Sequence, residues 1–352
     1  MEAFEPFSIR TCEGSFAKDH RVRRYAPIQD KPYSPFEIYD PFGLRNAIVP
    51  VFRQDLEGRM YGLGTAFHVD GFGSFLTAYH VIDFIEQKAV SRPILFLGMH
   101  AVIFGTVCIP PDCFVPAVEI QVPMSETDDP LAKLRGETTS RPAIDVASLK
   151  ADRLGTGVKP PQTLPVRSSG WVPKLGEIVL AIGFPQLDLS EVDESAQRAL
   201  LSEGMFGAYG RITEVHPEGT SRSNSTPVFV VESDWPSGMS GGPVLNCRGE
   251  VVGMVSRSLP PEEGQPGVGF AAFFGLIPDL ERLAPTIDKD NPGWRLCWGV
   301  FSERDQAPSS LHASREAAEQ AAKELDPPGA IRWISNRIGT DDFVGGLMPL
   351  ES

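Results

Sequence analysis

The sequence predicts a mainly β fold, built as barrels or a sandwich and not as an α/β sheet. Short apolar segments rich in β-branched residues follow one another between turn residues from about residue 44 to 280. Long helical periodicity is absent across the same region. The candidate strands are residues 46–52, 61–69, 75–77, 93–97, 143–149, 177–182, 228–232, 251–256 and 268–272.

Composition limits the class of protein and its partners. The 352 residues are enough for two or three domains. An apolar fraction of 41% and a charged fraction of 22% are ordinary for a soluble protein with a sizeable core. A formal net charge of −14 leaves no basic surplus to neutralise phosphates, so we expect no nucleic-acid partner.

The N-terminal residues and the cysteines give information about the cellular compartment. The first residues lack a positive segment followed by an apolar core, and no window approaches a membrane span. Cys108 and Cys113 either pair, share a metal or are buried thiols, and the scattered spacing of all five cysteines favours buried thiols. The sequence therefore predicts a cytoplasmic chain that makes no membrane contact.

Segments outside the β region divide the chain further. Residues 1–43 lack clear periodicity and are expected to form an N-terminal extension. Residues 124–139 and the acidic residues 187–204 are expected to be inserted loops. The second loop is either a solvated surface loop or a gate over a functional cleft.

The C-terminal segment is expected to be a separate small unit. A short helix over 277–284 closes the β region, residues 285–292 form a linker, and 293–352 form a β-α-β module. Ser314 is the expected N-cap of its helix. The module is too small for a large core of its own, so we expect it to pack on the rest of the chain or to bind a partner.

The segment Ser237-Gly-Met-Ser-Gly-Gly-Pro243 has the form expected around a nucleophilic serine. Such a serine needs a tight turn to project its hydroxyl and nearby backbone N–H groups for the oxygen that becomes negative. The glycines permit close approach and unusual dihedral angles. The structural alternative is a glycine-rich turn before a strand.

Two further segments supply partners for Ser240. His80, in the segment 76–82, is expected at the end of an apolar strand, and Asp145 opens an alternating strand whose other inward residues are apolar. A buried carboxylate needs a partner, which a histidine N–H would supply. Taken separately, His80 could be a core histidine and Asp145 an edge residue.

Together the Thr-Ala-x-His, Asp-Val-Ala-x-Leu-Lys and Gly-x-Ser-Gly-Gly-Pro-Val segments resemble the trypsin/chymotrypsin superfamily of serine proteases. The similarity is greatest to the bacterial HtrA-like branch, without the Gly-Leu-Gly-Phe loop of its usual PDZ companion. The resemblance implies two six-stranded antiparallel β-barrels within a protease domain at 44–284. The barrels are expected at about 44–150 and 165–278, with the active site between them.

The resemblance also implies a serine endopeptidase that acts on proteins or peptides and needs no cofactor or metal. Ser240 would attack the scissile carbonyl, His80 would transfer the proton and Asp145 would orient the histidine. The N–H groups of Gly238 and Ser240 would form the oxyanion hole. Met239 replaces the aspartate that pairs with a new N-terminus in digestive proteases, so the oxyanion loop is held another way or is ordered by a ligand or partner.

Substrate-binding residues are also expected from the resemblance. Asp234 is either the acidic base of a specificity pocket that favours Arg or Lys, or a turn residue. Ser256, Arg257 and Ser258 are expected to pair with the substrate as an added strand. Arg257 is also placed to neutralise Asp234. A peptide-binding scaffold without turnover and an esterase-like hydrolase are the alternative functions.

Overall fold

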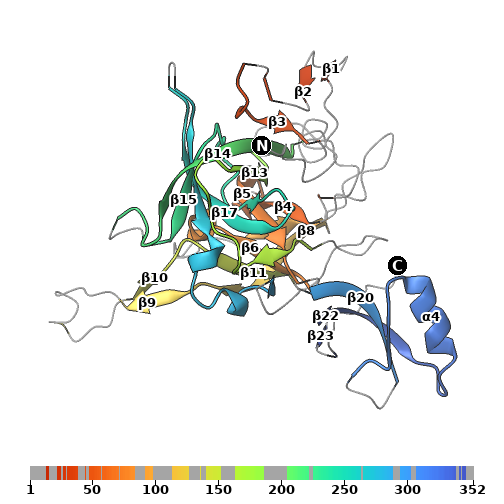
Figure 1. Ribbon diagram of the computed structural model, residues 1–352. Helices are drawn as coiled ribbons and strands as arrows, with labels where there is room; N and C mark the ends of the chain where they lie inside the picture. The colour runs from red at the N-terminus through yellow and green to blue at the C-terminus, as the bar shows by residue number, and fades with distance from the viewer. Residues whose placement is uncertain are drawn as a thin grey trace.

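The fold is mainly β with few helices, as the sequence predicts (Figure 1). The computed structural model describes residues 13–15, 22–24, 27–28, 30–38, 44, 47–56, 58–70, 72–83, 92–97, 113–126, 135, 140–151, 163–185, 204–221, 225–262, 265–287, 294–302, 307–337, 341 and 343–345. The predicted loop 187–204 and Cys108 lie outside these residues, apart from Gly204.

The first barrel closes from six antiparallel strands in the order β11-β6-β5-β4-β7-β8. The strands are β4 (Ile48–Gln54), β5 (Met60–His68), β6 (Ser74–Thr77), β7 (Ile94–Phe96), β8 (Phe114–Gln121) and β11 (Ala147–Ala151). Strand β8 was not predicted, because Pro116 and the polar residues that follow it interrupt the apolar alternation.

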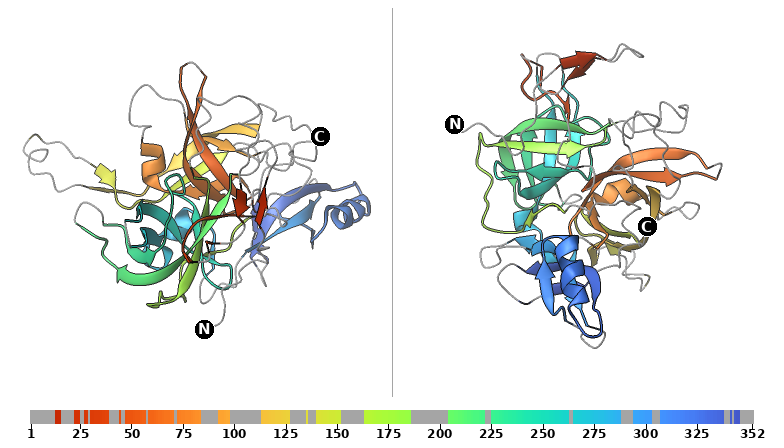
Figure 2. Two further views of the ribbon diagram at one scale, coloured as in Figure 1. Left: turned by 90° about the horizontal axis from the view of Figure 1, so that it is seen from above. Right: turned by 90° about the vertical axis from the view of Figure 1, so that its right-hand side faces the viewer.

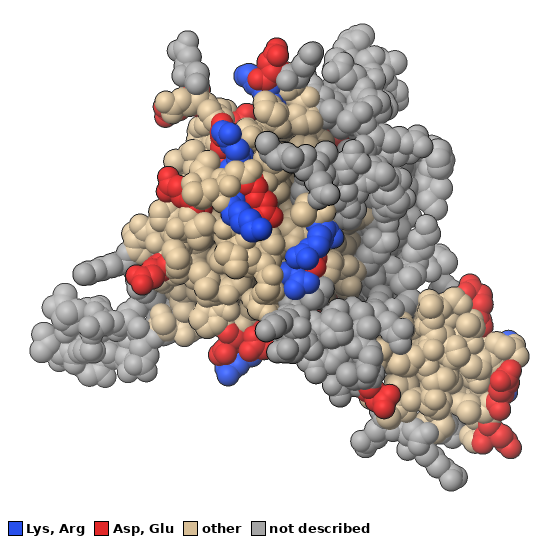
Figure 3. All heavy atoms as spheres, viewed as in Figure 1, with Lys and Arg blue, Asp and Glu red and all other residues tan. Residues whose placement is uncertain are grey.

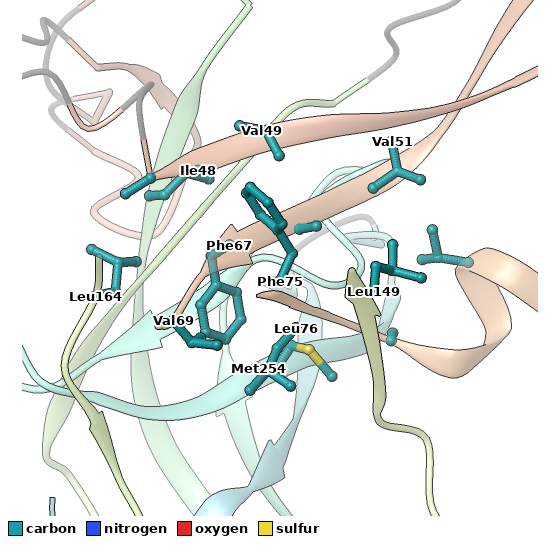
Figure 4. Packing of buried hydrophobic residues seen from close by; sticks show 14 of the residues in the cluster. Ile48, Val49, Val51, Phe67, Val69, Phe75, Leu76, Leu149, Leu164 and Met254 are labelled. Carbon is teal, nitrogen blue, oxygen red and sulfur yellow. The ribbon is translucent and has the colours of Figure 1, made fainter. Parts of the chain in front are cut away.

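Buried apolar side chains of the first barrel pack in one cluster (Figure 4). Phe67 and Phe75 come from adjacent strands of the barrel, and both are buried. Met254, which belongs to the second barrel, packs into the same cluster. The two barrels therefore share buried apolar surface, which fixes one against the other.

The second barrel also closes from six antiparallel strands, in the order β16-β13-β14-β15-β18-β17 with β16 paired to β17. The strands are β13 (Ile178–Gly183), β14 (Phe206–His216), β15 (Val228–Glu232), β16 (Pro243–Leu245), β17 (Val251–Leu259) and β18 (Val268–Phe273). Two closed six-stranded barrels are what the family resemblance implied.

Short strands from outside the barrels extend this second sheet. Strand β3 (Phe36–Glu37), from the predicted N-terminal extension, pairs with β14. Strand β12 (Val166–Arg167) runs parallel to β17 and to β19 (Thr286–Ile287), which lies in the predicted linker. Two hairpins lie apart from the barrels, β1 (Glu13–Ser15) with β2 (Val22–Arg24), and β9 (Met124–Glu126) with β10 (Ser140–Pro142).

The C-terminal module is a four-stranded sheet with one helix, and it projects from one side of the barrels in all views (Figures 1 and 2). The sheet order is β21 (Ser310–His312), β20 (Trp294–Phe301), β22 (Ala330–Arg337) and β23 (Phe343–Gly345). Helix α4 (Arg315–Lys323) begins after Ser314, whose side chain accepts a hydrogen bond from the Ala317 N–H as predicted. Phe72 of the first barrel packs into the core of the module.

Two further features concern helices and charge. The helix expected over 277–284 is a short 3₁₀ turn at Leu280–Arg282, preceded by another at Phe274–Leu276. None of the helices in the described part of the chain is both long and apolar enough to cross a bilayer. On the face in Figure 3 acidic and basic side chains are interspersed. In the C-terminal module Glu316, Glu324 and Asp326 are exposed.

Candidate active site

His80 and Asp145 lie together beside the first barrel. His80 is in the short helix α1 (Tyr79–Ile82), which directly follows β6, and not at the end of the strand itself. Its Nδ1 atom is 3.0 Å from both carboxylate oxygens of Asp145. The His80 backbone N–H also donates to Asp145 Oδ1 at 3.0 Å. Because a carboxylate only accepts hydrogen bonds, this contact places the imidazole proton on Nδ1 and leaves Nε2 as the basic nitrogen.

Asp145 is held from three directions. It lies in a bend just before β11, and its side chain is 17% exposed. The Ser256 hydroxyl donates to Asp145 Oδ2 at 2.5 Å, and the Asp145 N–H donates to the Thr226 hydroxyl at 2.8 Å. The carboxylate thus receives the hydrogen bonds that compensate its partial burial.

The environment of His80 raises its pKa above the ordinary histidine value. Partial burial opposes protonation, but the hydrogen bond and the negative charge of Asp145 outweigh it, and Asp83 adds a smaller attraction. The imidazole side chain is 43% exposed, so a ligand can reach it. The arrangement stabilises an imidazolium, which is what a histidine that takes up a proton during a reaction requires.

Ser240 lies in the turn before β16. Its hydroxyl donates to the carbonyl of Ser256 at 3.4 Å. Among the described residues it makes no hydrogen bond with His80. Ser256 therefore contacts both Asp145, through its hydroxyl, and Ser240, through its carbonyl. The sequence predicted Ser256 for substrate pairing and gave no signal for this bridging position.

The turn around Ser240 depends on glycine. Gly238 has a φ of 95° and Gly241 a φ of 83°, which are left-handed values that other residues rarely adopt. A Cβ atom on Gly241 would lie 2.1 Å from the Thr65 carbonyl oxygen. Within the described part of the chain, the N–H groups of Gly238 and Ser240 have no protein acceptor.

Asp234 and Arg257, two residues expected to set specificity, are each bound by other partners. Asp234 Oδ1 accepts from the N–H of Gly267 at 2.7 Å. Arg257 donates to the Thr220 hydroxyl at 2.6 Å, and its guanidinium lies 4.3 Å from the ring centre of Phe270. The Arg257–Asp234 pair suggested by the sequence is therefore not formed, because the guanidinium is held by Thr220 and Phe270.

Comparison with known proteins gives relatives of one kind. A protein described as "Probable periplasmic serine endoprotease DegP-like" from Pseudomonas fluorescens is 32% identical over 300 residues, which cover 84% of this chain and 50% of the relative. One of the same description from Pseudomonas putida is 31% identical over 182 residues, covering 51% of this chain and 32% of the relative. The chain thus spans half or less of the length of these relatives.

Among solved structures, the Rv3671c protease from M. tuberculosis in its active form has a TM-score of 0.39 and 18% identity, covering 71% of this chain and 89% of that one. The inactive form of the same protease gives a TM-score of 0.40 at 18% identity, covering 68% and 89%. Residues 64–254 match the family model described as "Trypsin-like peptidase domain". Since this match spans more than half of the sequence, the chain belongs to the trypsin-like peptidase family.

Proposed function

We propose that this protein is a serine endopeptidase that uses His80, Asp145 and Ser240 as its catalytic triad. The observation that carries the proposal is the contact of Asp145 with both His80 Nδ1 and the Ser256 hydroxyl, at 3.0 Å and 2.5 Å. This contact leaves Nε2 of His80 as the base. Ser256 in turn contacts Ser240, so one short chain of contacts connects all three residues.

The proposed reaction proceeds in two acyl-transfer steps. Ser240 Oγ attacks the carbonyl carbon of the scissile bond while His80 Nε2 takes the hydroxyl proton. The imidazolium, which Asp145 stabilises, returns that proton to the leaving amine. Water then hydrolyses the acyl-enzyme with the same base. The N–H groups of Gly238 and Ser240 donate to the oxyanion, and loss of one such donor typically costs about 10²–10³ in rate.

The substrate is proposed to be a protein or peptide that adds a strand to β17. Strand β16 pairs with β17 only as far as Met254, while β18 continues along Arg257, Ser258 and Leu259. Residues 256–258 thus have a described strand neighbour on one side only, which suits backbone pairing with an extended peptide.

Asp234 is better suited to the turn role than to recognition of Arg or Lys. Its Oδ1 accepts from the Gly267 N–H, and the Ser233 N–H donates to the Gly267 carbonyl at 2.9 Å. These two bonds join the segment before residues 237–241, which we call the nucleophile turn, to the segment before β18. We therefore propose that Asp234 fixes this junction.

The alternative of a peptide-binding scaffold has one observation in its favour, which is that the Ser240 hydroxyl bonds to Ser256 and not to His80.

The cytoplasmic location expected from the sequence is not supported, because the relatives named above are described as periplasmic.

Labelling with a fluorophosphonate probe separates these functions. We expect the wild-type protein to be labelled at Ser240, and Ser240→Ala and His80→Ala to remain unlabelled while keeping the wild-type thermal unfolding midpoint. A wild type that binds an extended peptide but is not labelled would reject the endopeptidase and support the scaffold.

A further inference from the structure

One buried residue of the first barrel contacts both residues of the proposed oxyanion hole. Thr65, on β5, donates its N–H to the carbonyl of Ser240 at 2.8 Å. Its hydroxyl donates to the carbonyl of Gly238 at 3.0 Å. The two residues whose N–H groups would hold the oxyanion therefore have their carbonyl oxygens bound by the same residue, which comes from the other barrel.

The polar groups of Thr65 are shielded from solvent, and each of them is hydrogen-bonded. The residue is completely buried. Its hydroxyl accepts from the Phe184 N–H at 3.0 Å while it donates to Gly238. Its partner on β4 is Pro50, which has no N–H, and the Thr65 carbonyl accepts from the Thr77 hydroxyl at 2.8 Å. A hydroxyl with both a donor and an acceptor partner has a fixed orientation.

The turn that contains Met239 and Ser240 is closely packed against neighbouring strands. A Cβ atom on Gly183 would lie 2.9 Å from the Thr65 hydroxyl oxygen and 3.0 Å from Met239 Cα. Gly183 is the last residue of β13, so the end of this strand lies against both Thr65 and the nucleophile turn. The turn is therefore enclosed between β5 and the end of β13.

We propose that Thr65 is the positioning residue of the oxyanion hole, and that it takes the place of an ion pair in holding the turn. Gly238 has no side chain, so its peptide groups rotate more freely than those of other residues. Its carbonyl is bound by Thr65, while its N–H has no acceptor among the described residues and is left for the substrate. The inference rests on the proposed function, because it assigns Thr65 a part in the same acyl transfer.

The test compares Thr65→Val, which has nearly the same shape without the hydroxyl, with Thr65→Ser, which restores the hydroxyl. The rate of fluorophosphonate labelling is measured as a function of probe concentration, giving a maximal rate and a half-saturating concentration. We expect Thr65→Val to lower the maximal rate by about 10–100-fold, as misplacement of one oxyanion donor would. The half-saturating concentration should change by less than about threefold, and Thr65→Ser should recover most of the rate.

Thr77→Val is the matched control. It removes another fully buried threonine hydroxyl, one that contacts Thr65 but not the carbonyls of the turn. We expect it to lower the unfolding midpoint by a similar amount while its labelling rate stays within about threefold of the wild type. An equal loss of rate in both valine variants, or an unchanged rate in Thr65→Val, would overturn the inference. An unreactive wild type would instead reject the proposed function, and this inference with it.

Discussion

Replacing Gly241 by alanine tests whether the nucleophile turn is as closely packed as the structure indicates. Gly241 and Gly176 have almost the same φ, 83° and 84°. A Cβ atom on Gly176 would meet nothing within 4 Å, whereas on Gly241 it would lie 2.1 Å from the Thr65 carbonyl oxygen and 2.4 Å from Thr77 Oγ1. Gly176→Ala is therefore a control that has the same backbone cost without the steric overlap.

The expected free energies of unfolding follow from these contacts. A left-handed alanine costs about 1–2 kcal/mol, partly offset by a reduction of about 0.4–1 kcal/mol in the entropy of the unfolded chain. We expect Gly176→Ala to lose about 1 kcal/mol or less. Gly241→Ala adds an overlap of roughly 1 Å with backbone that cannot easily yield, which raises its loss to about 3–5 kcal/mol.

Urea unfolding of the wild type and the two variants, analysed by linear extrapolation, gives the loss in unfolding free energy of each variant. Fluorophosphonate labelling, measured below the unfolding transition, should fall in Gly241→Ala and remain at the wild-type rate in Gly176→Ala. Equal losses of stability in the two variants would refute the argument, because they would show that the turn relaxes around an added methyl group.

Two further predictions concern titration. Asp145→Asn removes the charge that raises the pKa of His80, so the rising limb of the labelling rate, which needs neutral His80, should move to lower pH. The maximal rate should fall by about 10³–10⁴, and a limb that stays in place would contradict the assignment. For Asp70, burial opposes ionisation, but contacts with His68, Lys150 and Ser74 outweigh it and hold the pKa far below the usual value. This stabilisation is present above the unfolded pKa near 4 and is lost as pH falls, so Asp70→Asn should cost about 1–3 kcal/mol at pH 7 and progressively less towards pH 2, measured by urea unfolding across that range. A loss that is constant over the range would contradict the Asp70 assignment.

The three residues of the proposed triad could be selected from the sequence because each lies in a segment with its own local signal. Ser240 lies in a glycine-rich turn, and His80 follows an apolar segment. Asp145 is a single carboxylate at the start of an alternating segment. What sequence patterns could not give was the local conformation, so His80 was expected at a strand end and lies in a helix of four residues. Such a short helix has no periodicity to detect.

Strand β14 was not predicted because glycines weaken the β pattern over its first half. Gly207 and Gly210 are unfavourable in an isolated strand. In the folded protein, however, a Cβ atom on Gly207 would lie 3.1 Å from both Ile38 and Phe36, and one on Gly210 would lie 3.0 Å from Val231. The glycines are needed for close packing against segments distant in sequence, which a local pattern does not reveal.

Two threonines that contact the candidate site, Thr226 and Thr65, were missed for the same reason. Thr226 contacts Asp145 across 81 residues of sequence, and the Thr65 hydroxyl contacts Gly238 across 173. A buried threonine in a β strand is ordinary, because β-branched residues favour strands whatever their hydroxyl contacts. Only the closed barrels bring these hydroxyl groups to the turns that they hold.

Met239 gives the nucleophile turn an apolar contact with the second barrel. The residue before Ser240 is fully buried in the apolar core of the second barrel. Burial of a methionine side chain stabilises its position by about 1.5–3 kcal/mol. The hydroxyl of Thr65 holds the adjacent Gly238 carbonyl from the opposite barrel. We propose that these two contacts together order the turn. Because neither involves a charged group, we expect their strength to be independent of the ionisation of a partner.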